Sequence, residues 1–180
     1  MPSLAELDAA LDAVRQSPRD HGRLELIVRR PAEHQRELLA EGELSLVDGL
    51  VGDNWLKRGS RHTPDGAADI DAQLTLMNSR AIALLAPERA GWAPAGDQLF
   101  VDLDLSQENL APSARLAIGD VVVEVSAAPH TGCKLFAQRY GVDAVKWVNS
   151  AVGKQLRLRG LNAKVVRPGV VRVGDVVRKL

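Results

Sequence analysis

The stretch ARLAIGDVVVEVSAAPHTGCKLF, residues 114–136, decides the fold of this chain. Its first part alternates apolar and polar residues and is rich in Val, which predicts two β-strands around a turn at Gly119–Asp120. Pro129 and Gly132 then interrupt the strand pattern, and helical spacing begins near Lys134. The sequence therefore predicts an antiparallel hairpin, followed by a loop that leads into a helix.

Segments with the same strand character occur on both sides of this hairpin. They are LELIVRR (24–30), a segment reached through turns within 31–54, QLTLM (73–77), DQLFVDLDL (97–105) and LNAKVVRPGVVRVGDVV (161–177). We expect the last of these to form a second hairpin around Pro168–Gly169. Short strands joined by Gly and Pro turns favour a closed or nearly closed barrel, because closure removes exposed sheet edges. The predicted fold class is mainly β, a β-barrel of antiparallel hairpins with a few short helices.

Short helices are expected at four places: residues 3–17, 78–86, 133–140 and 141–153. The first begins with Ser3 and Glu6, which are spaced as a capping box, and it is amphipathic. In the third, we expect Leu135 and Phe136 to face the same way. The sequence therefore predicts that helices interrupt the sheet.

The length and composition predict one globular domain. The chain has 180 residues, of which 46% are hydrophobic and 26% charged, so a single core can form. We expect residues 1–40 to form an N-terminal helix and first strand packed on the barrel, and residues 41–180 to form the barrel domain. The large side chains of Trp92, Trp147 and Phe136 are expected in the core.

Several classes of protein are unlikely on charge and composition. Lys plus Arg and Asp plus Glu both number 23, so no overall positive field attracts nucleic acid. No apolar run is long enough to cross a membrane, since IALLA (82–86) is followed by Pro87 and Glu88. A single Cys excludes an internal disulfide, and the acidic first residues do not resemble a signal peptide. We therefore expect a cytoplasmic protein that binds neither nucleic acid nor membrane.

Cys133 is the best candidate for the functional atom. It lies in APHTGCK (128–134), where a strand passes through a loop into the start of a helix. The helix N-terminus and the neighbouring His130 and Lys134 would favour a thiolate, which can carry a persulfide or bind a soft metal. The alternative is that this lone Cys is a small, buried hydrophobic residue.

A basic loop offers candidate anion contacts. Residues 57–71 contain Gly, Pro, Ser and Asp without periodic apolar positions, and they carry Lys57, Arg58, Arg61 and His62. Arg can hold a phosphate or carboxylate through a bidentate fork. The same reasoning applies to Lys154, Arg157 and Arg159, and in both sets the alternative is an ordinary solvated surface.

Taken in order, several segments give the chain a resemblance to the MOSC family, a domain found at the C-terminus of eukaryotic molybdenum cofactor sulfurases and as small stand-alone bacterial proteins. The segments are Gly49–Asp53, QLTLMNSRAI (73–82), Glu108-Asn109-Leu110, residues 114–136 with Cys133, and GLNAKVVRPGVVRVGD (160–175). The resemblance covers roughly residues 41 to 180.

The resemblance implies a β-barrel that binds the molybdenum cofactor (molybdopterin) or handles sulfur through Cys133. Cys133 would be the catalytic residue and the metal ligand. Contacts to the pterin cofactor are expected from a further set of residues: His130, Thr131, Lys134, Asn109, Arg58, Arg61 and His62. A sulfur-donor or electron-donor protein would then be the partner.

Two other functions fit the same residues. One is a molybdenum-dependent reductase of N-hydroxylated compounds, which some relatives resemble, and which would need electrons from another protein. The other is a non-catalytic interaction domain on the same barrel, for which Trp55 gives some support, because it stands near a place where the family often has His.

Overall fold

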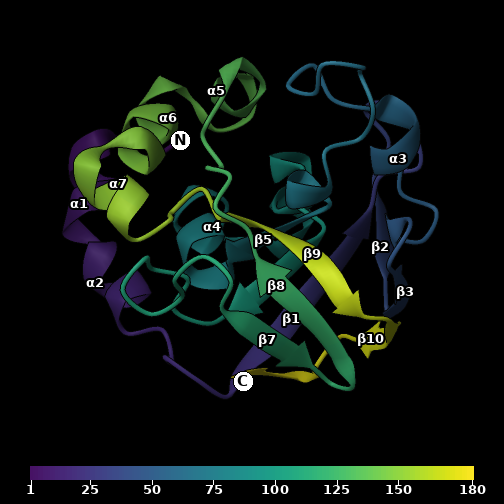
Figure 1. Cartoon of the computed structure of the whole chain (residues 1–180). Coiled ribbons are helices and arrows are strands. Elements are labelled where there is room, and N and C mark those ends of the chain that lie inside the picture. Colours follow the sequence, from purple (N-terminus) through teal and green to yellow (C-terminus); the bar gives the residue numbers. More distant parts are fainter.

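The computed structural model of the protein describes residues 1–180, and its centre is a closed β-barrel (Figure 1). The strands of the barrel are β1 (Gly22–Arg29), β5 (Leu74–Asn78), β6 (Leu99–Asp102), β7 (Arg115–Ile118), β8 (Val121–Val125), β9 (Leu161–Arg167) and β11 (Val176–Lys179). They are ordered β11-β7-β8-β9-β5-β6-β1, and the pairing of β1 with β11 closes the ring. This confirms the predicted mainly β, barrel fold class.

Most neighbouring strands of the barrel are antiparallel, as predicted. The hairpin of β7 and β8 turns at Gly119–Asp120, with Ile118 paired to Val121. Gly119 has φ +56°, a left-handed conformation that glycine adopts without steric cost. The exception is the parallel pair of β5 and β6, which is connected through helix α4 (Ser79–Leu85).

The hairpin predicted around Pro168–Gly169 is wrong. β9 pairs with β8 and β5, whereas β10 (Gly169–Arg172) leaves the barrel and pairs with β3 (Glu41–Ser45). Pro168 has no N–H to continue the ladder, and the chain crosses here from the barrel to a second sheet. That sheet has the order β10-β3-β4, with β4 at Gly49–Leu50, while β2 (Glu37–Leu39) adds to β1 of the barrel.

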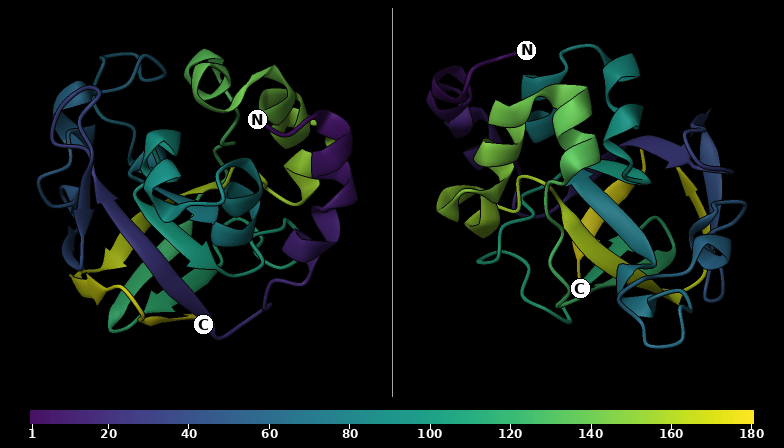
Figure 2. Two further views of the ribbon diagram at one scale, coloured as in Figure 1. Left: turned by 180° about the vertical axis from the view of Figure 1, so that it is seen from behind. Right: turned by 90° about the horizontal axis from the view of Figure 1, so that it is seen from above.

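The helices are short, and most of them gather on one side of the barrel (Figures 1 and 2). They are α1 (Leu4–Ala9), α2 (Leu11–Arg15), α3 (Trp55–Arg58), α4, α5 (Lys134–Tyr140), α6 (Val142–Asn149) and α7 (Ala151–Gln155), with 3-10 turns at Ile70–Ala72, Arg89–Gly91 and Ala93–Ala95. The capping box of Ser3 and Glu6 is confirmed. The expected loop at 57–71 is partly wrong, because its first two residues belong to α3 and it ends in a 3-10 turn. No helix is both long and apolar enough to cross a lipid bilayer.

One expectation about α5 is also wrong. Phe136 is buried, but Leu135 is 47% exposed, so the two side chains point to different sides. Neighbouring residues of a helix lie about 100° apart, and only Phe136 reaches the helix-side core.

Two hydrophobic clusters hold the molecule together. The first fills the barrel with residues such as Leu24, Leu76 and Val123. The second lies between the barrel's outer face and the helices, and it contains the expected core residues Trp92, Trp147 and Phe136. Buried apolar area of this kind supplies most of the folding free energy, and the second cluster fixes α5, which borders the site.

Candidate functional site

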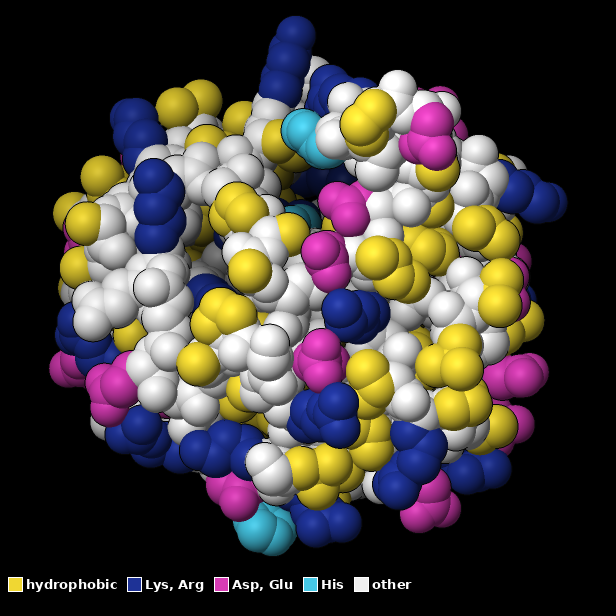
Figure 3. All heavy atoms as spheres, in the orientation of Figure 1, with side chains coloured by type: hydrophobic (Ala, Val, Ile, Leu, Met, Phe, Trp, Pro, Cys, Tyr) yellow, Lys and Arg dark blue, Asp and Glu magenta, His cyan; other side chains and the backbone are white.

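A cleft of about 780 Å³ lies between two connections at one end of the barrel. One wall is the segment from Ser126 to Cys133, here called the strap, together with α5; the other is α3 and the loop after it (Figure 1). The turn around Gly96 and the β1–β2 connection also contribute. In Figure 3 the mouth is a hollow near the top of the molecule, with Lys, Arg and His side chains around and inside it.

Cys133 is exposed and lines this cleft. It is the N-cap residue of α5, with extended backbone, and its carbonyl accepts a 3.0 Å hydrogen bond from Ala137 N–H. The alternative that Cys133 is a buried hydrophobic residue is therefore wrong. Its thiol is accessible to a ligand or a partner from the cleft side.

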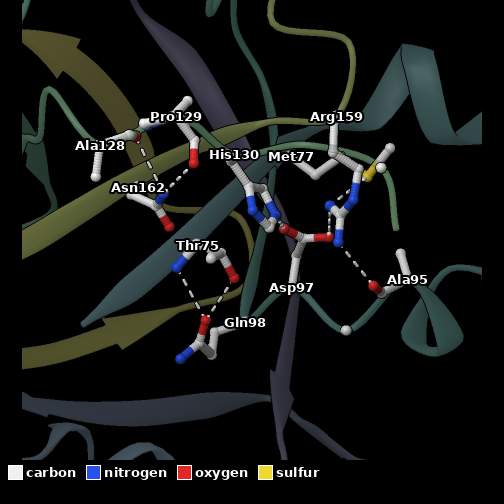
Figure 4. A network of polar contacts seen from close by, with 12 residues as sticks. Thr75, Met77, Ala95, Asp97, Gln98, Ala128, Pro129, His130, Arg159 and Asn162 are labelled. Carbon is white, nitrogen blue, oxygen red and sulfur yellow. Dashed lines mark hydrogen bonds and ion pairs between the residues drawn. The ribbon is translucent and has the colours of Figure 1, made fainter. Parts of the chain in front are cut away.

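Two asparagines fix the strap that carries Cys133. Asn149 binds both backbone groups of Gly132, accepting from its N–H at 2.9 Å and donating to its carbonyl at 3.0 Å. Asn162 donates to the carbonyls of Ala128 and Pro129 at 3.1 and 3.2 Å (Figure 4). Such side-chain hydrogen bonds hold a loop that has no sheet partner, so the thiol is presented from an ordered segment.

A buried chain of polar groups lies beneath the strap. Nε2 of His130 is 2.9 Å from Oδ1 of Asp97, and Nη1 of Arg159 donates to Oδ2 of Asp97 at 2.6 Å (Figure 4). Asp97 is fully buried, and the Arg159 side chain is only 7% exposed. Arg159 neutralises the carboxylate, which burial alone would make costly, and both partners orient it.

The charges of Asp97 and Arg159 and the burial of the ring set the protonation state of His130. Burial tends to raise the pKa of Asp97, but the Arg159 charge and the hydrogen bond with His130 hold the pKa well below its usual range. Burial, and then the charge of Arg159, lower the pKa of His130, and Asp97 opposes this only in part. An ionised Asp97 can only accept, so Nε2 of a neutral His130 carries the proton and Nδ1 keeps a free lone pair.

The cleft is strongly cationic, and part of its charge has no carboxylate partner. Arg30 is neutralised by Asp53, with hydrogen bonds of 2.8 Å from both Nε and Nη2. By contrast, Arg36 and Arg139 donate to backbone carbonyls only. Burial and the positive charges of Arg139 and Arg30 lower the pKa of Arg36. These like charges lie close together, and an anion between them would offset their repulsion.

The guanidinium groups of Arg36 and Arg139, which have no carboxylate partner, both lie next to Gly96. A Cβ on Gly96 would lie 3.7 Å from Nη2 of Arg36 and 3.8 Å from Nη1 of Arg139. Gly96 has φ +92°, where other residues are strained. The turn therefore brings the backbone and two arginines, which are far apart in the sequence, to one place.

The residues expected at the site from the sequence fall into two groups. His130, Thr131, Cys133, Arg58 and His62 all line the cleft.

The other three lie outside it. Lys134 is exposed at the start of α5 but does not line the cleft, and Arg61 lines a neighbouring cavity of about 460 Å³. Asn109 lies elsewhere, where its amide donates to the carbonyls of Arg19 and Asp104 at 2.9 and 2.7 Å. Its hydrogen bonds suit a structural role.

Sequence reasoning missed Arg30, Arg36, Arg139 and Asp97 as site residues. Arg30 directly follows the apolar strand β1. A charged residue next to a run of buried residues is the one local signal that could have marked it. Arg36 and Arg139 look like ordinary surface residues, and Asp97 looks like the polar start of a strand. Arg159, considered as an anion contact from its charge alone, instead lies buried against Asp97.

Comparisons with known proteins give one family-model match and several structures of similar fold. The family model of the MOSC domain matches residues 67–178. Among solved structures, the YuaD protein from Bacillus subtilis has a TM-score of 0.63 at 14% identity, covering 87% of this chain and 93% of that chain. YiiM from Escherichia coli has a TM-score of 0.56 at 20% identity, covering 88% of this chain and 69% of that chain. No curated protein matches the chain. At these identities the solved structures establish the likeness of fold.

Proposed function

Because the chain belongs to the MOSC domain family, we propose that its cleft binds the molybdenum cofactor and that the Cys133 thiolate is a ligand of the metal. The observation that carries the proposal is an exposed cysteine on the wall of a cationic cleft. A soft thiolate is a suitable ligand for a metal of this kind. When bound, the cofactor would supply electron-transfer chemistry that protein side chains lack.

The side chains of the cleft suit a pterin that carries a phosphate. Arg36 and Arg139 have no carboxylate partner, and a phosphate can accept charge-assisted hydrogen bonds from both. Oδ1 of Asn54 and Nε of Arg159 are buried without a hydrogen-bond partner, although both residues line the cleft. A heterocycle with donors and acceptors along its edge would satisfy such groups. A volume of about 780 Å³ is within the usual range for cofactor sites.

The chain's own residues have separate roles in this proposal. Asn149 and Gly132 hold the loop that presents the thiol. Neutral His130 offers a free Nδ1 on the cleft wall, where it can accept or return a proton. Asp97 and Arg159 keep the imidazole in that tautomer and orientation.

Sulfur carriage on Cys133 is the second candidate, and the exposure of the thiol favours it. The Cys133 thiolate would attack the outer sulfur of a persulfide on a donor protein. A new S–S bond would form at Cys133, and the donor cysteine would leave as its thiolate. This reaction needs a protein partner to reach the strap, whereas cofactor binding needs only the cleft.

The first experiment is elemental analysis for molybdenum, together with pterin content, on protein purified from cells competent in cofactor synthesis. We expect metal and pterin in the wild type, and loss of the metal in Cys133→Ser. Val152→Ser, which changes an exposed residue of α7 outside the cleft and leaves the thiol in place, is the control and should keep both.

The other outcomes separate the alternatives. Equal molybdenum in the wild type and in Cys133→Ser would overturn the role of the thiolate. No molybdenum in either protein, with a persulfide detected on Cys133 by mass spectrometry, would favour sulfur carriage. If neither molybdenum nor persulfide is detected, the result would favour a non-catalytic interaction domain. Metal-loaded protein would be tested next as a reductase of N-hydroxylated compounds.

A further inference from the structure

A second pocket, of about 610 Å³, lies on the other side of the strap from the cleft. Pro129, His130 and Thr131 line both spaces, so the strap is their common wall. The far side of the pocket is formed by α7, by the start of β9 and by the connection from β6 to β7. Asn162, which lines the cleft and not this pocket, holds the strap through hydrogen bonds to the carbonyls of Ala128 and Pro129.

The pocket carries positive charge without any neighbouring acid. Lys154 and Arg157 line it, and its lining contains no Asp or Glu. Lys154 is exposed, and its amino group is in no ion pair of the structure. The pocket therefore differs from the ordinary protein surface, where charges of both signs are mixed.

Arg157 is held in place by the backbone. Its Nη1 donates to the carbonyls of Leu105 at 3.2 Å and Leu110 at 2.6 Å, and its φ of +50° is unusual for a residue other than glycine. Burial lowers the pKa of Arg157, and no carboxylate offsets the effect. A strained, half-buried cation fixed in this way is a feature more often found at binding sites than on plain surfaces.

A buried hydroxyl in the same pocket lacks a partner. Ser126 is 8% exposed, and its Oγ makes no hydrogen bond in the chain, although Ser126 lines the pocket. Buried polar groups are nearly always hydrogen-bonded, so an unpaired hydroxyl in a pocket that two cations also line points to a ligand. The hydroxyl can donate to an anionic oxygen.

We propose that this pocket binds a tetrahedral oxyanion of the phosphate or sulfate class, with Arg157 and Lys154 neutralising its charge and the Ser126 hydroxyl donating to one oxygen. A free oxyanion and the phosphate end of a larger ligand share this chemistry, and the titration below separates them. The site is separate from the cleft and does not depend on Cys133 or on a metal. It would give the strap, and with it His130, a ligand on each face.

The test is a titration of 15N-labelled protein with inorganic phosphate, sulfate and glycerol 3-phosphate, followed by amide shifts. Shifts at Ser126 and Gly160 report this pocket, and shifts at Gly96 and Arg139 report the cleft. We expect a saturable response at the pocket amides, and the same response in Cys133→Ser. Tighter binding of glycerol 3-phosphate than of phosphate would identify the end of a larger ligand, and the reverse order a free oxyanion.

Two variants and a control decide the assignment. Lys154→Met should weaken binding at the pocket amides about five-fold, the size expected for one exposed charge pair, and leave the cleft amides unchanged. Ser126→Ala should weaken it further when combined with Lys154→Met. Lys146→Met, an exposed lysine of α6 paired with Asp143, should have no effect.

The proposal is overturned if phosphate and sulfate shift only the cleft amides, or if the double variant binds at the pocket as the wild type does. Neither result depends on molybdenum content. The failure of this proposal is therefore distinguishable from the failure of cofactor binding.

Discussion

The carboxylate of Asp97, which is fully buried, lies 2.9 Å from Nε2 of His130, three residues before the exposed Cys133. The other oxygen of Asp97 accepts from Arg159. This arrangement links the floor of the cleft to the strap.

Replacing Asp97 with Asn should strongly destabilise the protein. Arg159 would remain buried without a counter-charge, and breaking a buried pair from one side costs about 3–5 kcal/mol. The free energy of unfolding in urea measures the loss. Asp102→Asn is the matched control: it breaks the partly exposed pair with Arg80 and should cost about 1 kcal/mol or less. A smaller loss in Asp97→Asn than in Asp102→Asn would contradict the account.

Stability should fall as the solution is made mildly acidic, and His130 should cause part of the fall. The pKa of His130 is lowered in the folded protein, so the unfolded chain takes up the proton first as the pH falls. The stabilisation is therefore complete above the unfolded pKa, about 6.5, and is lost as the pH drops through the folded value.

Between pH 7.5 and 5, the free energy of unfolding of His130→Gln in urea should depend less on pH than that of the wild type. His21→Gln, which replaces an exposed histidine, should show the same dependence as the wild type. NMR of the wild-type imidazole at pH 7 should show a neutral ring with the proton on Nε2. A protonated ring at pH 7 would refute the assignment.

Replacing Arg36 should leave the stability of the ligand-free protein unchanged or higher, and should weaken its affinity for the cofactor. Its pKa is lowered by burial and by Arg139 and Arg30, so Arg36→Ala relieves repulsion, and the melting temperature without ligand should stay the same or rise. A lost charge-assisted hydrogen bond, about 1.5–3 kcal/mol, should lower affinity for a phosphorylated pterin at least ten-fold.

Isothermal titration with the pterin measures that affinity, and Arg178→Ala removes an exposed cation on β11 as the control. A lower melting temperature of Arg36→Ala with unchanged affinity for the pterin would show that Arg36 acts in folding alone.

Asn149 should control how the cysteine is presented. Asn149→Ala removes both hydrogen bonds to Gly132 and leaves its N–H and carbonyl unpaired, so stability should fall by about 1–3 kcal/mol. Hydrogen exchange at the Gly132 amide should become faster, and the rate of Cys133 alkylation should change. Gln107→Ala removes one bond from an exposed amide to the Lys154 carbonyl and should alter neither rate. An unchanged exchange rate at Gly132 would show that the two hydrogen bonds from Asn149 do not hold this part of the strap.

Local patterns in the sequence predicted the parts of the fold that depend on neighbours in the chain. The hairpin at Gly119–Asp120 and the helix capped by Ser3 are of this kind. The strand β10 was misplaced because its partner, β3, lies far away in the sequence, and nothing near Pro168 reveals that pairing.

The same limit applies to the site. Cys133 stood out because its own loop and helix marked it. Asp97 and Arg159 are separated by many residues, and only the barrel brings them together. Arg36 and Arg139 likewise meet only at the turn of Gly96. Charge counts describe the whole chain, so an even total concealed a cleft in which cations outnumber acids.

The pairing of Gly22 with Val177, which closes the barrel, also has a consequence for biosynthesis. β1 leaves the ribosome early, but the part of its edge at Gly22 and Arg23 must wait for β11, which is made much later, whereas Ile27–Arg29 pair with β2. Until then the edges of β1 and β7 are open, and open edges invite pairing with other chains. A nascent or C-terminally clipped chain would therefore expose these edges to aggregation and to chaperones, although nearly all of its core residues are already present.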